Sequence, residues 1–497
     1  MNYKQYFTKF NENDNETVKQ YIPNDEAIPF LLEHAPRLYC PDGVIEETFA
    51  FRCWTLRKHI KRTEDGYLLS EFLVNGQMPW AGKHNTINAP LTHHLNEARW
   101  LGISDKLIDY IDFFINGEGS ALRSGSAFAY HTPALYAMYE FCLVSGREDY
   151  LSENAEGFER YFLEFERRHL TGGGLYGSND DREGTEYSIS GTTPELKRSD
   201  GIRPLFNSCI CADAAALSEI FKLSGDGERA KRYAERSRRI AELINERMWD
   251  GDFYKAIHPA DGDLCRAVDC SDIPEECNAR ELVGYIPWVF GIPTPGREAA
   301  FSYLKDESVF SGGTGFTTAD ISHPRFMYYP ERGCTWNGKV WPYATSYAIG
   351  AVIRLLEDYE GQRVIDNRDL YSFIKKYAEM HYSVEDGVRV NFIDEVMMPY
   401  EPVWCVREMA KRGEIKPTGG PDRGKDYNHS TFIDLVIRGL LGVSVRSGEL
   451  SVSPRIEGIW DWFRLENLSY RGKRYNVYYD CDGRHFGRGV GVSVEEL

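Results

Sequence analysis

The sequence predicts a mainly α-helical protein, an (α/α)6 toroid with a small β-rich appendage at its C-terminal end. Two observations lead to this fold. Apolar residues recur at helical spacing in about a dozen segments, which alternating short and long loops connect. An open solenoid of helix pairs should show a repeat of fixed period, and no such repeat occurs in the chain. A closed ring of helix pairs therefore explains the pattern better than a solenoid.

We divide the chain into three parts. Residues 1–44 are polar and contain prolines, and we expect this N-terminal segment to pack on the barrel. Residues 45–442 form the expected barrel, which opens with the apolar periodicity of Ile45–Thr63. Residues 443–497 contain short alternating runs separated by glycine turns, which indicates strands. This last part is too short to fold alone, so we predict a structural appendage.

The charge balance narrows the choice of partners. The 497 residues include 58 Lys plus Arg and 76 Asp plus Glu, for a net charge of -18. Nucleic acids and anionic membranes both attract basic surfaces, so we expect neither as a partner. No apolar run reaches the length of a membrane span, and no apolar signal segment opens the chain, so we expect a protein that is neither inserted nor secreted.

The cysteines point to the cytoplasm. The 11 cysteines are scattered and form no Cys-x-x-Cys motif, which is typical of a cytoplasmic protein with reduced thiols. No spacing of potential ligands indicates a metal site. We therefore expect neither a metal nor another cofactor.

Two loops rich in carboxylates are the strongest functional signal. The first, Thr171–Gly191, begins with three consecutive glycines. A solvated acidic loop is the ordinary explanation for such a segment. The second loop, Val388–Trp404, lies far downstream, and long irregular connections between helices tend to hold catalytic groups. The carboxylates of interest in the two loops are Asp180, Asp181, Glu183, Glu186, Asp394 and Glu395.

Aromatic and basic residues cluster in three further segments, Gln77–Gly102, Cys334–Val352 and Arg423–Ile437. Aromatic residues make up 13% of the chain, and their flat apolar faces suit sugar rings as well as protein cores. A structural role explains each clustered residue singly, but not their joint pattern. They are Trp80, His84, Arg99, Trp336, Trp341, Arg423, Tyr427 and His429.

Carboxylates on separate loops, surrounded by aromatic and basic side chains, are what hydrolysis of a glycosidic bond requires. One protonated carboxyl group gives its proton to the departing oxygen, and a second, ionised carboxylate activates water or attacks directly. Burial or nearby negative charge has to raise the pKa of the acid. The acidic run that begins at Asp180 could supply such a charge.

Several motifs resemble a known clan of enzymes. WNGKVWPYATS, residues 336–346, is similar to the Trp-Asn/Arg-Gly-x-x-Trp-Pro signature of the clan that holds glycoside hydrolase family 63 and the bacterial mannosylglycerate and glucosylglycerate hydrolases. GTEYS, residues 184–188, stands where those enzymes carry a Gly-Met-Asp-Asn-Ser-like motif. FIDEVMMPYEP, residues 392–402, resembles the motif that supplies their base. The resemblance covers roughly residues 80–497, RGKDYNHSTFIDLVI included.

The resemblance implies an inverting, exo-acting hydrolase of a small α-glucoside or α-mannoside, with a carbohydrate as its partner. It assigns the general acid to Glu186 and the general base to Glu395. The family has Asp at the acid position, so Asp181 and Glu183 remain competitors for that role. The Thr-Gly that usually follows the base is absent here, so Asp394 remains a competitor for the second role.

The expected substrate-binding residues fall into two groups by chemistry. Tryptophans would stack on the sugar or wall it, namely Trp80, Trp336, Trp341 and Trp404. Polar side chains would hold hydroxyls or an anionic aglycone, namely His84, Arg99, Asp181, Arg423, Tyr427 and His429.

Three other functions suit the same barrel. A sugar epimerase would use histidines as acid and base, and His94, His323 and His429 are available. A glycoside phosphorylase would need one carboxylate and a cationic pocket for phosphate. A non-catalytic sugar-binding protein would keep the tryptophans and need no carboxylate pair.

Overall fold

Six helical elements form a closed ring in the computed structural model, which describes residues 2–117, 130–258, 270, 273–329, 332–385, 387–446 and 448–497. Each element packs against the next, and the last packs against the first, which distinguishes a toroid from a solenoid. The ring consists of α4 (Leu91–Ala98), α6 (Ala134–Ser145), α10 (Pro204–Leu223), α12 (Ile286–Val289), α13 (Pro342–Asp358) and α16 (Phe432–Asp434), which a π-helical turn continues to Leu440.

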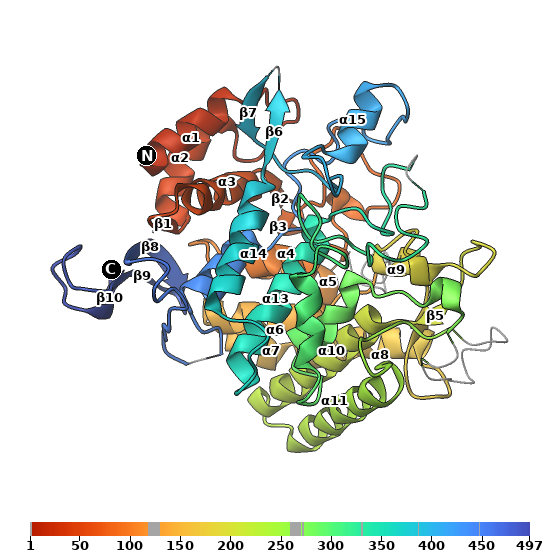
Figure 1. Ribbon diagram of the computed structural model, residues 1–497. Helices are drawn as coiled ribbons and strands as arrows, with labels where there is room; N and C mark the ends of the chain where they lie inside the picture. The colour runs from red at the N-terminus through yellow and green to blue at the C-terminus, as the bar shows by residue number, and fades with distance from the viewer. Residues whose placement is uncertain are drawn as a thin grey trace.

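A second layer of helices covers the ring from outside. The sequence of each layer explains its place, as α10 and α11 illustrate (Figure 1). Helix α10 is rich in small apolar residues and is buried on nearly all sides, whereas α11 is highly charged and buries a single face. The covering helices are α3 (Gly43–His59), α5 (Ile108–Ile115), α8 (Ala155–His169), α11 (Gly227–Arg247) and α14 (Asn367–Glu379).

The N-terminal segment is more structured than its polar composition predicts. It forms α1 (Tyr3–Glu12), α2 (Asn24–His34) and β1 (Arg37–Tyr39), and both helices pack on α3. Helix α1 buries four aromatic rings at helical spacing, which offsets its many polar residues. The sequence thus contained the signal for this helix. The buried rings are Tyr3, Tyr6, Phe7 and Phe10.

The C-terminal strands and the N-terminal strand form one antiparallel sheet, in the order β1-β8-β9-β10. Strand β1 pairs with β8 (Trp462–Tyr470), which places Arg37 opposite Glu466. Strands β9 (Lys473–Asp480) and β10 (Gly491–Glu496) complete it. Figure 1 shows the two chain ends on the same side of the molecule. The predicted β-appendage therefore exists, and the N-terminal segment supplies one of its strands.

Three two-stranded antiparallel sheets lie in the connections between helices in the described part of the chain. They are β2 (Ile60–Thr63) with β3 (Gly66–Leu69), β4 (Gly177–Ser178) with β5 (Gly201–Ile202), and β6 (Tyr382–Glu385) with β7 (Val388–Asn391). The remaining helices are short, namely α7 (Glu148–Glu153), α9 (Asp180–Glu183) and α15 (Cys405–Lys411).

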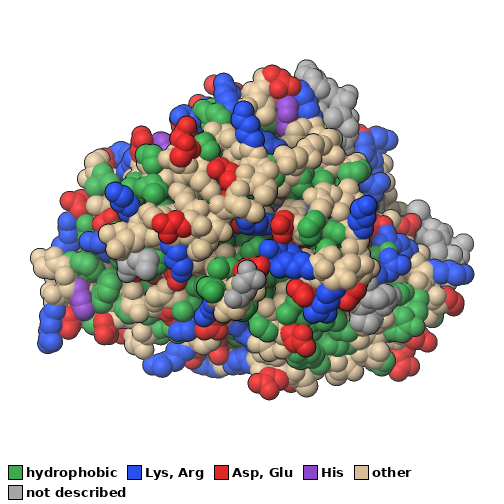
Figure 2. Space-filling view, turned by 90° about the horizontal axis from the view of Figure 1, so that it is seen from above, with side chains coloured by type: hydrophobic (Ala, Val, Ile, Leu, Met, Phe, Trp, Pro, Cys, Tyr) green, Lys and Arg blue, Asp and Glu red, His purple; other side chains and the backbone are tan. Residues whose placement is uncertain are grey.

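Charged side chains of both signs are scattered over the face of the molecule shown in Figure 2, interspersed with uncharged and hydrophobic groups. Within the described part of the chain, no helix combines the length and the apolar character that a bilayer crossing needs. The core is continuous, since buried residues of the N-terminal helices, the ring and the C-terminal sheet belong to one apolar cluster.

Candidate active site

A cavity of about 340 Å³ lies at the end of the ring where the inner helices begin. Proline opens α10 and α13, where its fixed φ and missing N–H suit the first turn of a helix. The cavity is lined by residues that directly precede or open the inner helices, such as Ala89, Tyr130, Trp341 and Tyr343. It also receives residues from the two predicted carboxylate loops.

Glu186 reaches the cavity from the first carboxylate loop. The backbone N–H of Trp336 donates to the Glu186 carbonyl oxygen at 3.0 Å, and Asp180 Oδ2 accepts from the N–H of Tyr187 at 2.8 Å. These bonds hold the loop, in which Tyr187 has a φ of 61°. Burial raises the pKa of the Glu186 carboxyl to about 7, and the charges of Asp180 and Glu395 add to the rise. The group can therefore carry a proton near neutral pH.

Glu395 reaches the same cavity from the second loop, just beyond β7. Its Oε2 atom accepts from Arg423 Nε at 3.0 Å and from Nη2 at 2.8 Å. The thiol of Cys334 lies beside this pair, 3.3 Å from Arg423 Nη2 and 3.8 Å from Glu395 Oε2. The contact is charge-assisted and fixes the carboxyl group beside the guanidinium. Glu395 is thus a candidate base where Glu186 is a candidate acid.

Asp394, the competitor for the base, lies behind Glu395. It does not line the cavity, and its Oδ1 atom accepts from the backbone N–H of Glu395 at 2.7 Å. Burial, followed by the charge of Glu395, raises its pKa to about 8. A Cβ atom on Gly424 would stand 1.8 Å from Asp394 Oδ1, so glycine is needed where the Arg423 segment crosses this loop.

Two of the predicted tryptophans form a stacked pair on the cavity wall. Trp336 and Trp341 have ring centroids 4.6 Å apart and planes inclined by 21°. Trp341 Nε1 donates to the Thr335 carbonyl at 2.9 Å, whereas Trp336 Nε1 is buried and has no hydrogen-bond partner within the described part of the chain. An unpartnered buried donor at a cavity wall is costly unless a ligand satisfies it.

A third carboxyl group, Glu71, lines the cavity and was absent from the predicted site. Its Oε2 atom accepts from Trp80 Nε1 at 3.2 Å, and Oε1 lies 3.6 Å from His429 Nε2. Burial, followed by the charge of Glu395, raises its pKa to about 8. Burial also lowers the pKa of His429 well below its usual range, so this ring is neutral. The sequence signal was one acidic residue inside the apolar run Gly66–Leu73.

Eight of the predicted site residues line this one cavity, although they come from five distant segments. They are Trp80, Glu186, Trp336, Trp341, Glu395, Arg423, Tyr427 and His429. The other lining residues were not predicted as binding groups. They are Glu71, Phe72, Ala89, Tyr130, Glu183, Gly184, Tyr187, Cys334 and Tyr343. Glu183 was, however, a competitor for the acid role, and its Oε2 atom accepts from Arg203 Nε at 2.6 Å.

Three predicted binding residues have other partners. Arg99 is buried between Glu140 and Asp434. Trp404 is also buried, and its Nε1 atom donates to the Tyr382 carbonyl at 3.0 Å. Asp181 is half-exposed and pairs with Arg198. None of the three lines the cavity among the described residues.

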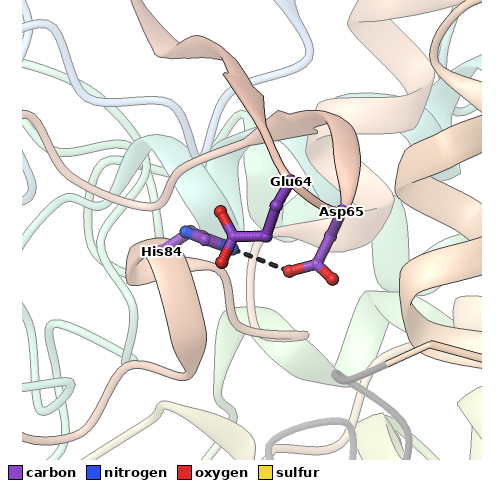
Figure 3. Close-up of side chains that lie close together, drawn as sticks. All are labelled: Glu64, Asp65 and His84. Atoms are coloured by element: carbon purple, nitrogen blue, oxygen red, sulfur yellow. Dashed lines mark hydrogen bonds and ion pairs between the residues drawn. The ribbon is translucent and has the colours of Figure 1, made fainter.

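His84 belongs to a separate cluster, beside the turn that connects β2 to β3. Figure 3 shows its ring facing Asp65 and Glu64, with His84 Nε2 at 2.8 Å from Asp65 Oδ2. The three residues could offer one ligand atom each to a metal ion. However, Lys83 Nζ lies 2.6 Å from Asp65 and 3.0 Å from Glu64, so a lysine already supplies positive charge there.

Comparisons with known structures support the fold class. A structure named sialidase is 29% identical with a TM-score of 0.86, and its match covers this whole chain but only 43% of the sialidase chain. The family 63 mannosylglycerate hydrolase of Thermus thermophilus, in complex with glucose, is 12% identical with a TM-score of 0.50, over 78% of this chain and 99% of its own. A bacterial glucoamylase complexed with acarbose is 12% identical with a TM-score of 0.52, over 83% of this chain and 57% of its own.

The similar structures include (α/α)6 glycoside hydrolases, which confirms the predicted toroid. A family model described as the mannosylglycerate hydrolase MGH1-like glycoside hydrolase domain matches residues 83–430. This range contains both carboxylate loops and the helical ring from α4 to α13, and it ends just before α16. The chain therefore belongs to the family of mannosylglycerate hydrolase MGH1-like glycoside hydrolase domains.

Proposed function

We propose that this protein hydrolyses a small α-glycoside, related to a glucoside or a mannoside, and releases one terminal sugar with inversion at the anomeric carbon. The observation that carries the proposal is a pair of carboxyl groups in one cavity with opposite surroundings. Burial raises the pKa of Glu186 to about 7, whereas Glu395 pairs with Arg423. One group can thus give a proton while the other accepts one.

In the proposed reaction, the Glu186 carboxyl gives its proton to the glycosidic oxygen as the bond from C1 to that oxygen breaks. Glu395 takes a proton from a water molecule, whose oxygen attacks C1 from the opposite face. The products are an alcohol and a sugar of inverted anomeric configuration. Exchange of protons with solvent then restores both carboxyl groups. The stacked pair of Trp336 and Trp341 would wall the sugar ring.

The size of the cavity supports exo action. Its volume of about 340 Å³ is at the low end of the range for ligand sites, which suits one sugar with part of an aglycone. We propose a small glycoside as the substrate because mannosylglycerate hydrolases are among the similar structures.

The geometry gives less support to epimerisation. Of the three histidines that an epimerase could use, His429 lines the cavity. His94 is buried with its Nδ1 atom at 2.9 Å from the Tyr110 hydroxyl, and His323 accepts from the N–H of Arg325. The similar structure named sialidase suggests release of an anionic sugar as a second candidate function.

The test is a turnover screen of the wild type, Glu186→Gln and Glu395→Gln on α- and β-linked disaccharides and glycosylglycerates. NMR would follow the product anomer with and without phosphate. Release of the inverted sugar by the wild type alone, independent of phosphate, would support hydrolysis and both roles. Phosphate-dependent turnover would indicate a phosphorylase, and sugar binding without turnover a binding protein. Unchanged turnover in both variants would exclude these two carboxyl groups as acid and base.

A further inference from the structure

We propose that Glu71 is a specificity-determining residue, which together with His429 Nε2 holds one hydroxyl group of an uncharged sugar and disfavours an anionic one. This assignment rests on the proposed function, because it names a recognition element of the same cavity. It adds a third carboxyl group to the acid and the base.

The contacts of Glu71 leave a place for a ligand hydroxyl. Glu71 Oε1 and His429 Nε2 are 3.6 Å apart, which is too long for a direct hydrogen bond. His429 Nε2 is buried and has no hydrogen-bond partner among the residues that the structure describes. A sugar hydroxyl can donate and accept at once, so one oxygen beside both atoms would satisfy the two groups. Trp336 Nε1 is a second unpartnered buried atom on the same cavity wall.

The position of Glu71 is fixed without a ligand. Its backbone N–H donates to the Asn85 carbonyl at 2.9 Å, and its Oε2 atom accepts from Trp80 Nε1. The neighbouring ring of Phe72 stacks on His429, with centroids 6.2 Å apart and planes inclined by 24°. The His429 ring is oriented in turn by a 2.7 Å hydrogen bond between its Nδ1 atom and the Tyr427 hydroxyl. Side chains held in this way bind a hydroxyl at a small entropic cost.

The charges around Glu71 explain the preference for an uncharged sugar. Among the described lining residues, Arg423 is the one cationic side chain, and its Nε and Nη2 atoms both contact Glu395. The acidic lining residues are Glu71, Glu183, Glu186 and Glu395. The tyrosine hydroxyls near Glu71 have raised pKa values and stay neutral, namely those of Tyr110, Tyr130 and Tyr427.

Burial and the charge of Glu395 also keep Glu71 protonated at neutral pH, since its pKa rises to about 8. In this form Glu71 donates a hydrogen bond to an oxygen of the sugar. A carboxylate on the sugar would instead enter a cavity in which Arg423, the one cationic side chain among the described lining residues, is already engaged by Glu395. Without a free cation beside it, the charged ligand loses its hydration without compensation and binds less tightly.

The experiment compares neutral and anionic glycosides that differ only at C6. Isothermal titration in the Glu186→Gln background would measure the affinity for 4-nitrophenyl α-mannoside and α-glucoside and for the two matching hexuronides. Turnover of the same compounds would be measured with Glu186 intact. Glu71→Ala and Glu71→Gln would be introduced into both backgrounds, and Glu153→Gln, on the exposed side of α7, would serve as the matched control.

We expect the neutral sugar to bind at least tenfold more tightly than its hexuronide. Glu71→Ala should weaken binding of the neutral sugar by about ten- to a hundredfold, because it removes the donor that holds the sugar oxygen beside His429. Glu71→Gln keeps a donor in the same place and should weaken binding less than tenfold. Between pH 7 and pH 9 the affinity should fall for the protein that retains Glu71 but not for the Glu71→Gln variant, a response that a purely structural role would not produce.

Three results would overturn the assignment, namely tighter binding of the hexuronide, equal affinity with and without Glu71, and no binding of either sugar. Absence of turnover combined with Glu71-dependent binding of the neutral sugar would refute the proposed hydrolysis and leave this assignment standing. Thermal unfolding of each variant would show whether a loss of affinity reflects a loss of folding.

Discussion

Two buried clusters of charge in this molecule differ in how completely their groups are paired. In the first, Arg99 bonds to Glu140 at 2.9 Å and to Asp434 at 2.9 Å through its Nε atom, and Trp100 Nε1 also donates to Asp434. Arg438 adds a second guanidinium to the same carboxylates. In the second cluster, the cavity, carboxyl groups outnumber cations among the described residues, and buried ring nitrogens lack partners.

The contrast separates a structural network from a site prepared for a ligand. Burial alone raises the pKa of any carboxyl group, but its neighbours decide the outcome. Against the effect of burial, the charges of Arg438 and Arg99 lower the pKa of Glu140 to about 2. In the cavity, where Arg423 is already engaged by Glu395, burial raises the pKa of Glu186 to about 7. The first cluster therefore stabilises the fold, and the second is suited to proton transfer.

The largest expected effect is on turnover. Glu186→Gln and Glu395→Gln should each lower kcat by about 10²–10⁴, because each removes one proton-transfer group. Glu186→Gln should unfold at or above the wild-type temperature, since burial disfavours the charged form of this carboxyl group. Glu395→Gln is left out of the stability comparison, because it removes the partner of Arg423. Steady-state kinetics and thermal unfolding would measure the two effects, with Glu153→Gln as control. A loss of stability comparable to the loss of turnover would erase the distinction between the clusters.

The next effect is on stability and concerns the first cluster. Arg99→Met should lower the free energy of unfolding by about 3–5 kcal/mol, because it leaves Glu140 and Asp434 buried with fewer cations. The folded fraction should retain wild-type KM. Denaturant unfolding and kinetics on the same preparation would test this. A raised KM without destabilisation would instead return Arg99 to the substrate-binding set.

A pH profile would test the acid itself. Glu186 has to be protonated to act, so kcat/KM should fall as pH rises through about 7. If the acid were an exposed glutamate, kcat/KM would fall near pH 4.5 instead. The two environments therefore predict midpoints that differ by more than two pH units. The profile should be measured with a substrate whose leaving group needs protonation. An activated aryl glycoside is the control, because its leaving group depends less on the acid. An alkaline limb near pH 4.5 would contradict the role of Glu186.

The smallest expected effect is a difference between the two clusters in how the free energy of unfolding depends on pH. The folded-state pKa of Glu71 is raised, so its contribution is complete below about pH 4.5 and is lost as pH rises toward 8. Glu71→Gln should therefore gain about 1–3 kcal/mol relative to wild type between pH 5 and pH 9. The folded-state pKa of Glu140 is lowered, so Glu140→Gln should lose stability at pH 7 and approach wild type as pH falls toward 2. Urea unfolding at each pH would give the free energy of unfolding. The same pH dependence of this free energy in both variants would contradict the pKa shifts.

Several parts of the site followed from local sequence, and others did not. The two carboxylate loops and the Trp336–Trp341 motif were evident because each lies within a short segment. Arg99 and Arg423 could not be told apart, since both stand near aromatic residues at the edge of a helix. Only the fold shows that Arg423 enters the cavity while Arg99 lies in the paired network. Glu71 was missed because a single acidic residue in an apolar run gives a weak signal.

The sequence by itself determined the class of fold, since the spacing of apolar residues fixes which segments become helices and strands. It also determined which loops are rich in carboxyl groups. The tertiary structure decided which of those groups share one cavity, because Glu71, Glu186 and Glu395 meet only when distant parts of the ring close. Their protonation follows from that meeting, since a pKa depends on burial and on neighbouring charges, whatever their separation along the chain.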